Sequence, residues 1–338
     1  MTTNRPDDSA RRGDELRAAA LPSVTVTILT WNGERYLDDI LLALENQKYG
    51  GVHDVLVVDS GSTDRTLEIV AAHPSVRLHE IPNSEFGHGK TRNLAAQLAV
   101  GDIVVYLTHD AVPASPDWLA AIVEPFVTDA RVAAVLGRQV ARPWAPPLLK
   151  YDIDRVFSRI GPPGVVTTFL DDGTLDDDLS KWRATFYSDT CSAARRDVVT
   201  GAVPYREVDY AEDQVFGRDI IAAGYAKAYA PDAVVEHSND GSLREFGQRI
   251  AADLLGLRAV GTEVAPVSRF AALTQWARWT LADTARLLRD RDYRFWRKLY
   301  WLAMNPVYHA VKWSSYRRAS LEDVSVATGA GQPPTGVQ

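Results

Sequence analysis

The chain has 338 residues, of which 46% are hydrophobic and 24% are charged, and its formal net charge is −7. This composition is ordinary for a globular protein, and the length suffices for one large domain or a domain with an appendage. The single cysteine, Cys191, excludes an intrachain disulfide framework, and no stretch approaches the ~18 consecutive apolar residues that a spanning helix needs.

Four short runs of β-branched and apolar residues occur in the first third of the chain. They are 23–29, 54–60, 76–81 and 102–107. Apolar residues recur at helical spacing between these runs, and strands that alternate with helices indicate a parallel sheet. Ligands of such sheets bind beyond the carboxyl ends of the strands. We therefore expect the functional site at 30–32, 59–62 and 108–110.

The middle of the chain, 131–240, is less regular. Residues 131–140 and 232–238 have the pattern of strands, and 212–225 has the pattern of a helix. Residues 170–182 are rich in aspartate and predict an acidic surface loop or a flap over an acceptor.

After residue 243 the pattern becomes helical, over 243–260, 268–290 and 293–318. The predicted organisation is a flexible leader at 1–20, a catalytic domain at 21–242, a helical region at 243–320 and a disordered tail at 321–338.

The helical region is basic and aromatic. Residues 243–318 contain fourteen Lys or Arg and six Asp or Glu, about +8, which leaves about −15 for the rest of the chain. Tryptophans and tyrosines alternate with these cations, which favours a lipid headgroup interface. The alternatives are packing on the catalytic domain or a homo-oligomer interface. We expect a cytoplasmic protein, with peripheral contact to the inner face of the cell membrane under the first interpretation, and no nucleic-acid partner.

The segment "VVDSGSTDRT" ends a predicted strand at Asp59 and Ser60. A carboxylate there can accept from a base N–H or from ribose hydroxyls. The segment is neither a GxGxxG fingerprint nor a Walker loop, which argues against dinucleotide and P-loop proteins.

The segment "SEFGHGKTRNLAA" opens a helix with glycines around His88, followed by Lys90 and Arg92. A helix N-terminus with two cations favours a diphosphate ligand.

The stretch "YLTHDAVPASPDWL" presents His109 and Asp110 at the end of a buried strand. One aspartate can hold a divalent cation when phosphates and a second side chain supply other ligands. His237, at the end of a later strand, is the candidate second ligand.

The adjacent acids Glu212 and Asp213 begin a predicted helix, where the helix dipole stabilises carboxylates. Their side chains point about 100° apart, so we expect different roles for them, one being general base catalysis.

These ordered motifs together resemble the family 2 glycosyltransferases, which have the GT-A fold. "VTILTWNGERYLDDILLALENQ" and "VLVVDSGSTDRTLEIV" are similar to that family's opening, and the likeness runs from about 23 to 240. "FGHGKTRN", "LTHDAVPASPDWL" and "FYSDTCSAARRDVV" resemble its dTDP-rhamnosyltransferase branch. The resemblance implies an α/β fold with a mostly parallel sheet flanked by helices and a C-terminal all-helical extension.

The resemblance also implies roles for matching positions. Those expected to hold the nucleoside are Thr30, Asn32, Glu34 and Asp59. Arg92 would approach the nucleotide or diphosphate. Asp110 would be the last acid of the metal-binding DxD motif, whose first acid is replaced here by Thr108. His237 would complete the site for Mg²⁺ or Mn²⁺, and Asp213 would be the general base.

The resemblance further implies an inverting transfer of a sugar, L-rhamnose from dTDP-rhamnose, onto a hydroxyl of a saccharide or polyprenyl-linked saccharide in cell-surface polysaccharide synthesis. Another UDP-, GDP- or dTDP-sugar is an alternative donor. A non-catalytic nucleotide-sugar or glycan-binding module on the same fold is a second alternative. A sugar-nucleotide pyrophosphorylase would need a Gly-rich loop with Arg and Lys after the first strand, which "TILTWNGERYL" lacks.

Overall fold

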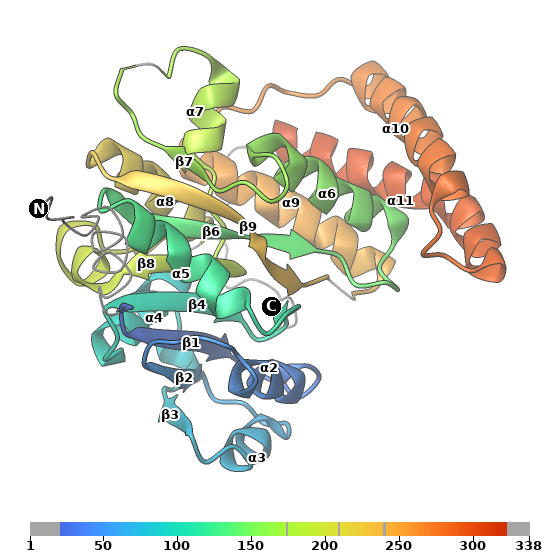
Figure 1. Ribbon diagram of the computed structural model, residues 1–338. Coiled ribbons are helices and arrows are strands. Elements are labelled where there is room, and N and C mark those ends of the chain that lie inside the picture. The colour runs from blue at the N-terminus through green and yellow to red at the C-terminus, as the bar shows by residue number, and fades with distance from the viewer. Residues whose placement is uncertain (1–20, 174, 209, 239–240, 323–338) are drawn as a thin grey trace, which may run out of the picture.

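The computed structural model describes residues 21–173, 175–208, 210–238 and 241–322 (Figure 1). The predicted leader at 1–20 lies outside the described residues, and so does the predicted tail from 323 onwards.

The first four strands form the parallel half of the sheet. They are β1 (Val24–Thr30), β2 (His53–Asp59), β3 (Val76–Glu80) and β4 (Ile103–Thr108). β1 lies between β2 and β4, and β3 lies at the edge beyond β2, all in parallel register. The carboxyl ends of β1, β2 and β4 therefore meet at one edge of the sheet, as the sequence predicts.

The second half of the sheet is mixed. Its strands are β5 (Val112–Pro113), β6 (Val132–Val140), β7 (Thr167–Phe169), β8 (Cys191–Arg195) and β9 (Ala226–Glu236). β8 runs antiparallel to both β4 and β6, whereas β6 and β9 are parallel. In the described chain these strands extend one sheet in the order β3-β2-β1-β4-β8-β6-β9-β5, with β7 paired to β9.

Helices cover both faces of the sheet (Figure 1). One core cluster contains apolar side chains of α2 (Leu37–Glu45) and α5 (Trp118–Thr128). The other contains side chains of α4 (His88–Leu98), α6 (Pro147–Ile160) and α8 (Glu212–Ala222). β4 serves both clusters because successive strand residues point to opposite faces, Val105 to the first cluster and Val104 to the second.

Two short helices complete this part of the fold, α3 (Thr66–Ala71) and α7 (Asp178–Thr185). The prediction of a loop over 170–182 was wrong for its second part, which belongs to α7. Asp177 caps α7 by accepting hydrogen bonds from the backbone N–H groups of Leu179 (2.8 Å) and Ser180 (3.0 Å). An aspartate that satisfies exposed N–H groups starts a helix even in a very acidic segment.

The C-terminal region consists of α9 (Leu243–Ala259), α10 (Arg269–Arg289) and α11 (Phe295–Leu321), close to the predicted bounds. A third apolar cluster, which includes Tyr151 of α6 and Trp301 of α11, attaches these helices to the α/β part.

Ion pairs join α6 to the same helices. Lys150 Nζ lies 2.7 Å from Asp290 Oδ2, and Arg155 Nη1 lies 2.9 Å from Asp283 Oδ1. Among the described residues, no helix combines the length and the apolar character needed to cross a membrane.

Candidate active site

The loop after β2 is folded around Asp59. This side chain is fully buried, and its Oδ2 accepts from the backbone N–H groups of Gly61 and Ser62, each at 2.9 Å. The Ser62 hydroxyl donates to Asp59 Oδ1 at 2.5 Å. A nucleoside can reach this carboxylate only after the loop shifts, so the nucleoside role of Asp59 stays a prediction.

The loop after β1 is tied to this second loop. Asn32, at a left-handed φ of 51°, accepts from the backbone N–H of Thr63 at 2.8 Å. Glu34 accepts from the backbone N–H of Arg65 at 3.1 Å. The backbone N–H of Ser60 donates to the carbonyl of Thr30 at 3.0 Å. Hydrogen bonds thus connect the loops after β1 and β2, which carry the residues predicted to hold the nucleoside.

Thr30 has a further feature. Its hydroxyl is buried, and within the described chain it has no hydrogen-bond partner. A Cβ on Gly33 would lie 2.6 Å from that hydroxyl and 3.2 Å from His109 Cβ. Glycine at 33 therefore lets the loop after β1 approach His109.

Asp110 and His237 meet beyond the ends of β4 and β9. His237 Nε2 lies 3.1 Å from Asp110 Oδ2, and the Thr108 hydroxyl donates to Asp110 Oδ1 at 2.7 Å. Burial alone would raise the pKa of Asp110, but His237, His109 and the Thr108 hydroxyl together hold it well below its usual range. Asp110 is therefore a fixed anion. Burial also lowers the pKa of His109, against the opposing effect of Asp110.

Arg142 holds the backbone around this pair. Its guanidinium donates to the carbonyl of Asp110 and, at 3.2 Å, to the carbonyl of Ser238. The same group lies 3.7 Å from the ring centroid of Tyr36, and Arg142 is almost completely buried. One side chain thus fixes the two segments that carry Asp110 and His237.

Besides the pair of Asp110 and His237, a second cluster of acidic side chains lies around the start of α8. Arg92 Nη1 donates to Glu212 Oε1, and Arg92 Nε lies 2.7 Å from Asp189 Oδ2. Asp213 follows Glu212 and accepts from the backbone N–H of Gln214 at 2.7 Å. Burial, with the charges of Glu212 and Asp189, raises the pKa of Asp213 well above its usual range. A carboxyl group with a raised pKa is suited to proton transfer.

The backbone before α8 adopts a conformation that is unusual for alanine. Ala211, which precedes Glu212, has a φ of 60°. Among the described residues, Asn32 and Ala211 are the non-glycine positions with positive φ, and both lie at this site. Such strain is held by surrounding contacts and often accompanies function.

The segment before α8 is also joined to the C-terminal helices, since the Tyr210 hydroxyl donates to Asp253 of α9.

The start of α4 lies beside the second acidic cluster. His88 Nδ1 is 4.0 Å from Glu212 Oε1, and burial lowers the pKa of His88. Lys90 is exposed. A Cβ on Gly89 would lie 2.2 Å from the carbonyl oxygen of Arg206. This glycine therefore permits close packing of α4 on the chain before α8.

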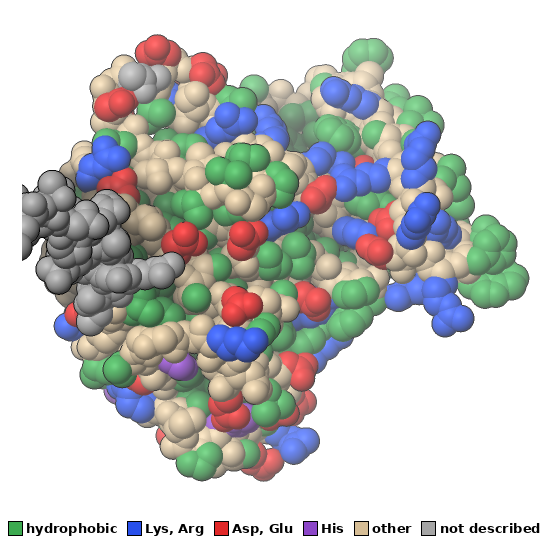
Figure 2. Space-filling view, in the orientation of Figure 1, with side chains coloured by type: hydrophobic (Ala, Val, Ile, Leu, Met, Phe, Trp, Pro, Cys, Tyr) green, Lys and Arg blue, Asp and Glu red, His purple; other side chains and the backbone are tan. Residues whose placement is uncertain are grey.

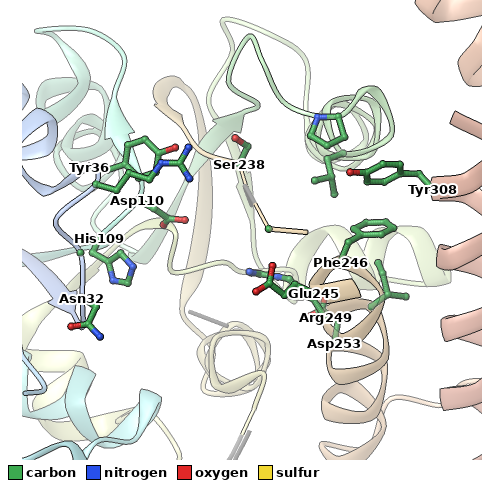
Figure 3. A pocket seen from close by; sticks show the side chains of 16 residues that line it. Asn32, Tyr36, His109, Asp110, Ser238, Glu245, Phe246, Arg249, Asp253 and Tyr308 are labelled. Carbon is green, nitrogen blue, oxygen red and sulfur yellow. The ribbon is translucent and has the colours of Figure 1, made fainter. Parts of the chain in front are cut away.

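A pocket of about 370 Å³ lies between the sheet edge and the C-terminal helices (Figure 3). Asn32, His109 and Asp110 line one side of it. The facing wall is formed mainly by α9, through Glu245, Phe246, Arg249, Ile250 and Asp253, together with Tyr308 of α11. Figure 3 shows Arg249 extending from α9 toward the side of Asp110 and His109.

Asp110 and His237 fit a divalent ion that is shared with a ligand. A carboxylate with an imidazole suits Mn²⁺, and the two atoms that would bind it, Asp110 Oδ2 and His237 Nε2, lie 3.1 Å apart. Among the described residues, no group of three or more His, Cys, Asp or Glu side chains could hold a metal. The two side chains would therefore need phosphate oxygens or water to complete the coordination.

Sequence reasoning missed several residues of this site. Asp189 lies within a quoted motif, but nothing local showed that it pairs with Arg92, 97 positions away. Arg142 and Arg249 belong to no motif. Arg249 could have been noticed because it is a basic residue on the apolar side of a predicted helix.

The sheet order, the polar edge and the facing helices define a GT-A-type fold. Solved structures support the fold alone. A mannosyltransferase, PcManGT from Pyrobaculum calidifontis, solved with GDP-Man and Mn²⁺, is 21% identical with a TM-score of 0.53, over 96% of this chain and 83% of that one. Glucosyl-3-phosphoglycerate synthase from Mycobacterium tuberculosis, solved with UDP, is 19% identical with a TM-score of 0.51, over 79% and 89%.

Sequence comparison identifies the family. Residues 25–201 match the family described as glycosyl transferase family 2. The O-antigen chain rhamnosyltransferase RfbN of Salmonella typhimurium is 32% identical over 67% of this chain and 69% of its own length. WbaN of Salmonella anatum, another O-antigen chain rhamnosyltransferase, is 32% identical over 68% and 70%. The chain therefore belongs to the family 2 glycosyltransferases, near the rhamnosyltransferase branch, which confirms the resemblance and the prediction of an enzyme.

Proposed function

We propose that this glycosyltransferase moves L-rhamnose from dTDP-rhamnose to a hydroxyl of a saccharide acceptor and inverts the anomeric centre. The observation that carries the proposal is the placement of two carboxylates at the site. Asp110 lies 3.1 Å from His237 at the sheet edge, and its pKa is lowered, whereas Asp213 lies in the first turn of α8, and its pKa is raised. The names of the relatives RfbN and WbaN support rhamnose as the sugar.

Asp213 is the general base in this proposal. In its ionised form it accepts the proton of the acceptor hydroxyl as the oxygen attacks the anomeric carbon from the face opposite the nucleotide. Glu212 forms an ion pair with Arg92. We therefore give Glu212 the role of positioning the start of α8, and Asp213 the role of proton acceptor. A single displacement of this kind yields an α-L-rhamnoside from a β-linked donor.

Asp110 and His237 hold Mg²⁺ or Mn²⁺ in this proposal. When bound, the ion supplies Lewis-acid stabilisation of the charge on the leaving diphosphate. Thr108 fixes the Asp110 carboxylate through its hydroxyl, and Arg142 fixes the backbone on both sides of the pair.

Arg249 contributes a second positive charge. It lines the same pocket as Asp110. A planar guanidinium can bind two phosphate oxygens at once. We therefore assign the leaving diphosphate to the space between Asp110 and Arg249.

The facing wall offers polar groups to a saccharide acceptor, since the carboxylates of Glu245 and Asp253 line it together with the mostly buried rings of Phe246 and Tyr308. We propose a cytoplasmic location and a role in cell-surface polysaccharide synthesis. An acceptor carried on a polyprenyl diphosphate would require the enzyme to act at a membrane surface.

A nucleotide screen tests the donor. Melting temperature is measured with dTDP, UDP and GDP and their sugars, with and without Mn²⁺, because ligands of the folded state raise it by mass action. We expect the largest rise with dTDP-rhamnose and Mn²⁺. A larger rise with a UDP- or GDP-sugar would reject rhamnose and leave the glycosyltransferase assignment intact.

A further inference from the structure

The outer surface of α10 and α11 carries large apolar side chains that the fold leaves in solvent. Trp296 is 77% exposed, Phe270 is 75% exposed and Leu281 is 71% exposed. We call this surface the α10–α11 face and define it by Phe270, Leu273, Leu281, Leu288, Phe295, Trp296, Leu299 and Tyr300. Along α10 the apolar members are three, seven or eight positions apart, which places them on one side of the helix.

These side chains are not needed for the internal packing of the helical region. Tyr293, Trp301 and Tyr308 point inward and are buried in the cluster that attaches α11 to α6. The same helices therefore carry one set of aromatics that is buried in the fold and another set that is largely exposed to solvent.

The α10–α11 face is also strongly basic. Residues 264–321 contain eleven Lys or Arg and three Asp. Asp283 is almost completely buried beside Arg155, and Lys150 pairs with Asp290 and Asp292. Figure 2 shows basic side chains beside apolar ones over the outer part of this region, at the right of the view. The exposed cations include Arg269, Arg278, Arg289, Arg291, Arg294 and Arg297.

The positive charge of the α10–α11 face distinguishes between two possible binding partners, a second copy of the chain and an anionic lipid surface. A second copy bound through a two-fold axis would place the face against itself, and like charges across an interface are unfavourable. An anionic lipid surface attracts the arginines, and its headgroup region accommodates tryptophan, tyrosine and phenylalanine.

We propose that the α10–α11 face docks peripherally on an anionic bilayer, with Phe295 and Trp296 entering the headgroup region. These two rings lie at the start of α11, with centroids 5.2 Å apart, and Arg291 and Arg294 precede them in the chain. This docking goes beyond the transfer reaction and does not depend on which sugar the enzyme uses.

Co-sedimentation with vesicles of phosphatidylcholine and phosphatidylglycerol, against phosphatidylcholine alone, tests the proposal on the full chain. We expect binding to the anionic vesicles at about 50 mM salt and release at about 500 mM, because salt screens the arginines. The double variant Phe295→Ser/Trp296→Ser should bind about tenfold more weakly. Arg291→Gln/Arg294→Gln should lose about fivefold per charge removed.

A matched control is Val52→Ser, since Val52 is 78% exposed in the loop before β2. It should bind vesicles like the wild type. Donor hydrolysis in solution should be unchanged in all variants, which shows that they fold. Failure of the wild type to sediment with anionic vesicles at low salt would overturn the proposal. So would a dimer by light scattering that Phe295→Ser/Trp296→Ser dissociates, because the face would then be a protein interface.

Discussion

The two acidic clusters of the site differ in what surrounds them. Asp110 lies beside two histidines and a hydroxyl donor, and its pKa is lowered despite burial. Asp213 lies beside Glu212 and Asp189, with Arg92 as the nearby cation, and its pKa is raised. Environments that push the pKa values of two carboxyl groups apart suit them to different roles. This contrast underlies our proposal that Asp110 binds a cation and Asp213 accepts a proton.

Asp213→Asn tests the proton acceptor and should have the largest effect. We expect kcat to fall by about 10³-fold, within the range for removal of a general base, while the melting temperature rises on dTDP binding as in the wild type. The measurement is initial rates of transfer with purified protein. Near-normal rates would remove Asp213 from the mechanism.

Asp110→Asn tests the cation-binding cluster. We expect kcat to fall by about 100-fold, and addition of Mn²⁺ should no longer strengthen dTDP binding in calorimetry. Thr108→Val is the matched variant, since it removes only the hydroxyl that donates to Asp110. It should retain metal-dependent binding, with reduced affinity. Unchanged metal dependence in Asp110→Asn would contradict the assignment.

Arg249→Gln tests whether the pocket wall formed by α9 contributes to binding of the leaving diphosphate. We expect dTDP to bind about tenfold more weakly, whereas thymidine binding should not change. Arg249→Lys should recover part of the loss. Arg244→Gln is the control, because Arg244 is exposed on the same helix. An effect confined to the KM of the acceptor would place Arg249 at the acceptor instead.

The smallest expected effect is on the pH dependence of stability, which tests whether the pKa of Asp213 is raised. Because folding raises the pKa of Asp213, its contribution to stability is present below the unfolded pKa of about 4 and is lost as pH rises through the folded value. Asp213→Asn lacks this loss. The variant should therefore melt at a higher temperature than the wild type near pH 8, with the difference shrinking toward pH 4. A constant difference across that range would argue against a raised pKa.

The sheet edge could be predicted from the sequence because local patterns specify it. Four strand patterns predicted where Asp59 and Asp110 lie, and the structure has β2 ending at Asp59 and β4 ending two residues before Asp110. Their ligand roles stay predictions. The GT-A fold and the three C-terminal helices were likewise predicted and are confirmed.

The second cluster and the helical wall could not be predicted in the same way. Pairing of Arg92 with Asp189 and Glu212 depends on tertiary packing of α4 against the chain before α8. The antiparallel insertion of β8 between β4 and β6 also had no local signal, because strand direction depends on the path of the long connection. Among the C-terminal aromatics, Trp301 is buried in internal packing, whereas Trp296 is exposed and its membrane contact stays a prediction.

The apolar cluster between α6 and the C-terminal helices limits how the enzyme can be shortened. A chain cut before residue 243 would uncover Leu148 and Tyr151, which are now buried, and would remove one wall of the pocket. It would also leave Lys150 and Arg155 without their aspartate partners on and beside α10. The part of the chain before residue 243 is therefore expected to aggregate when expressed alone, so a minimal functional enzyme should extend through α11.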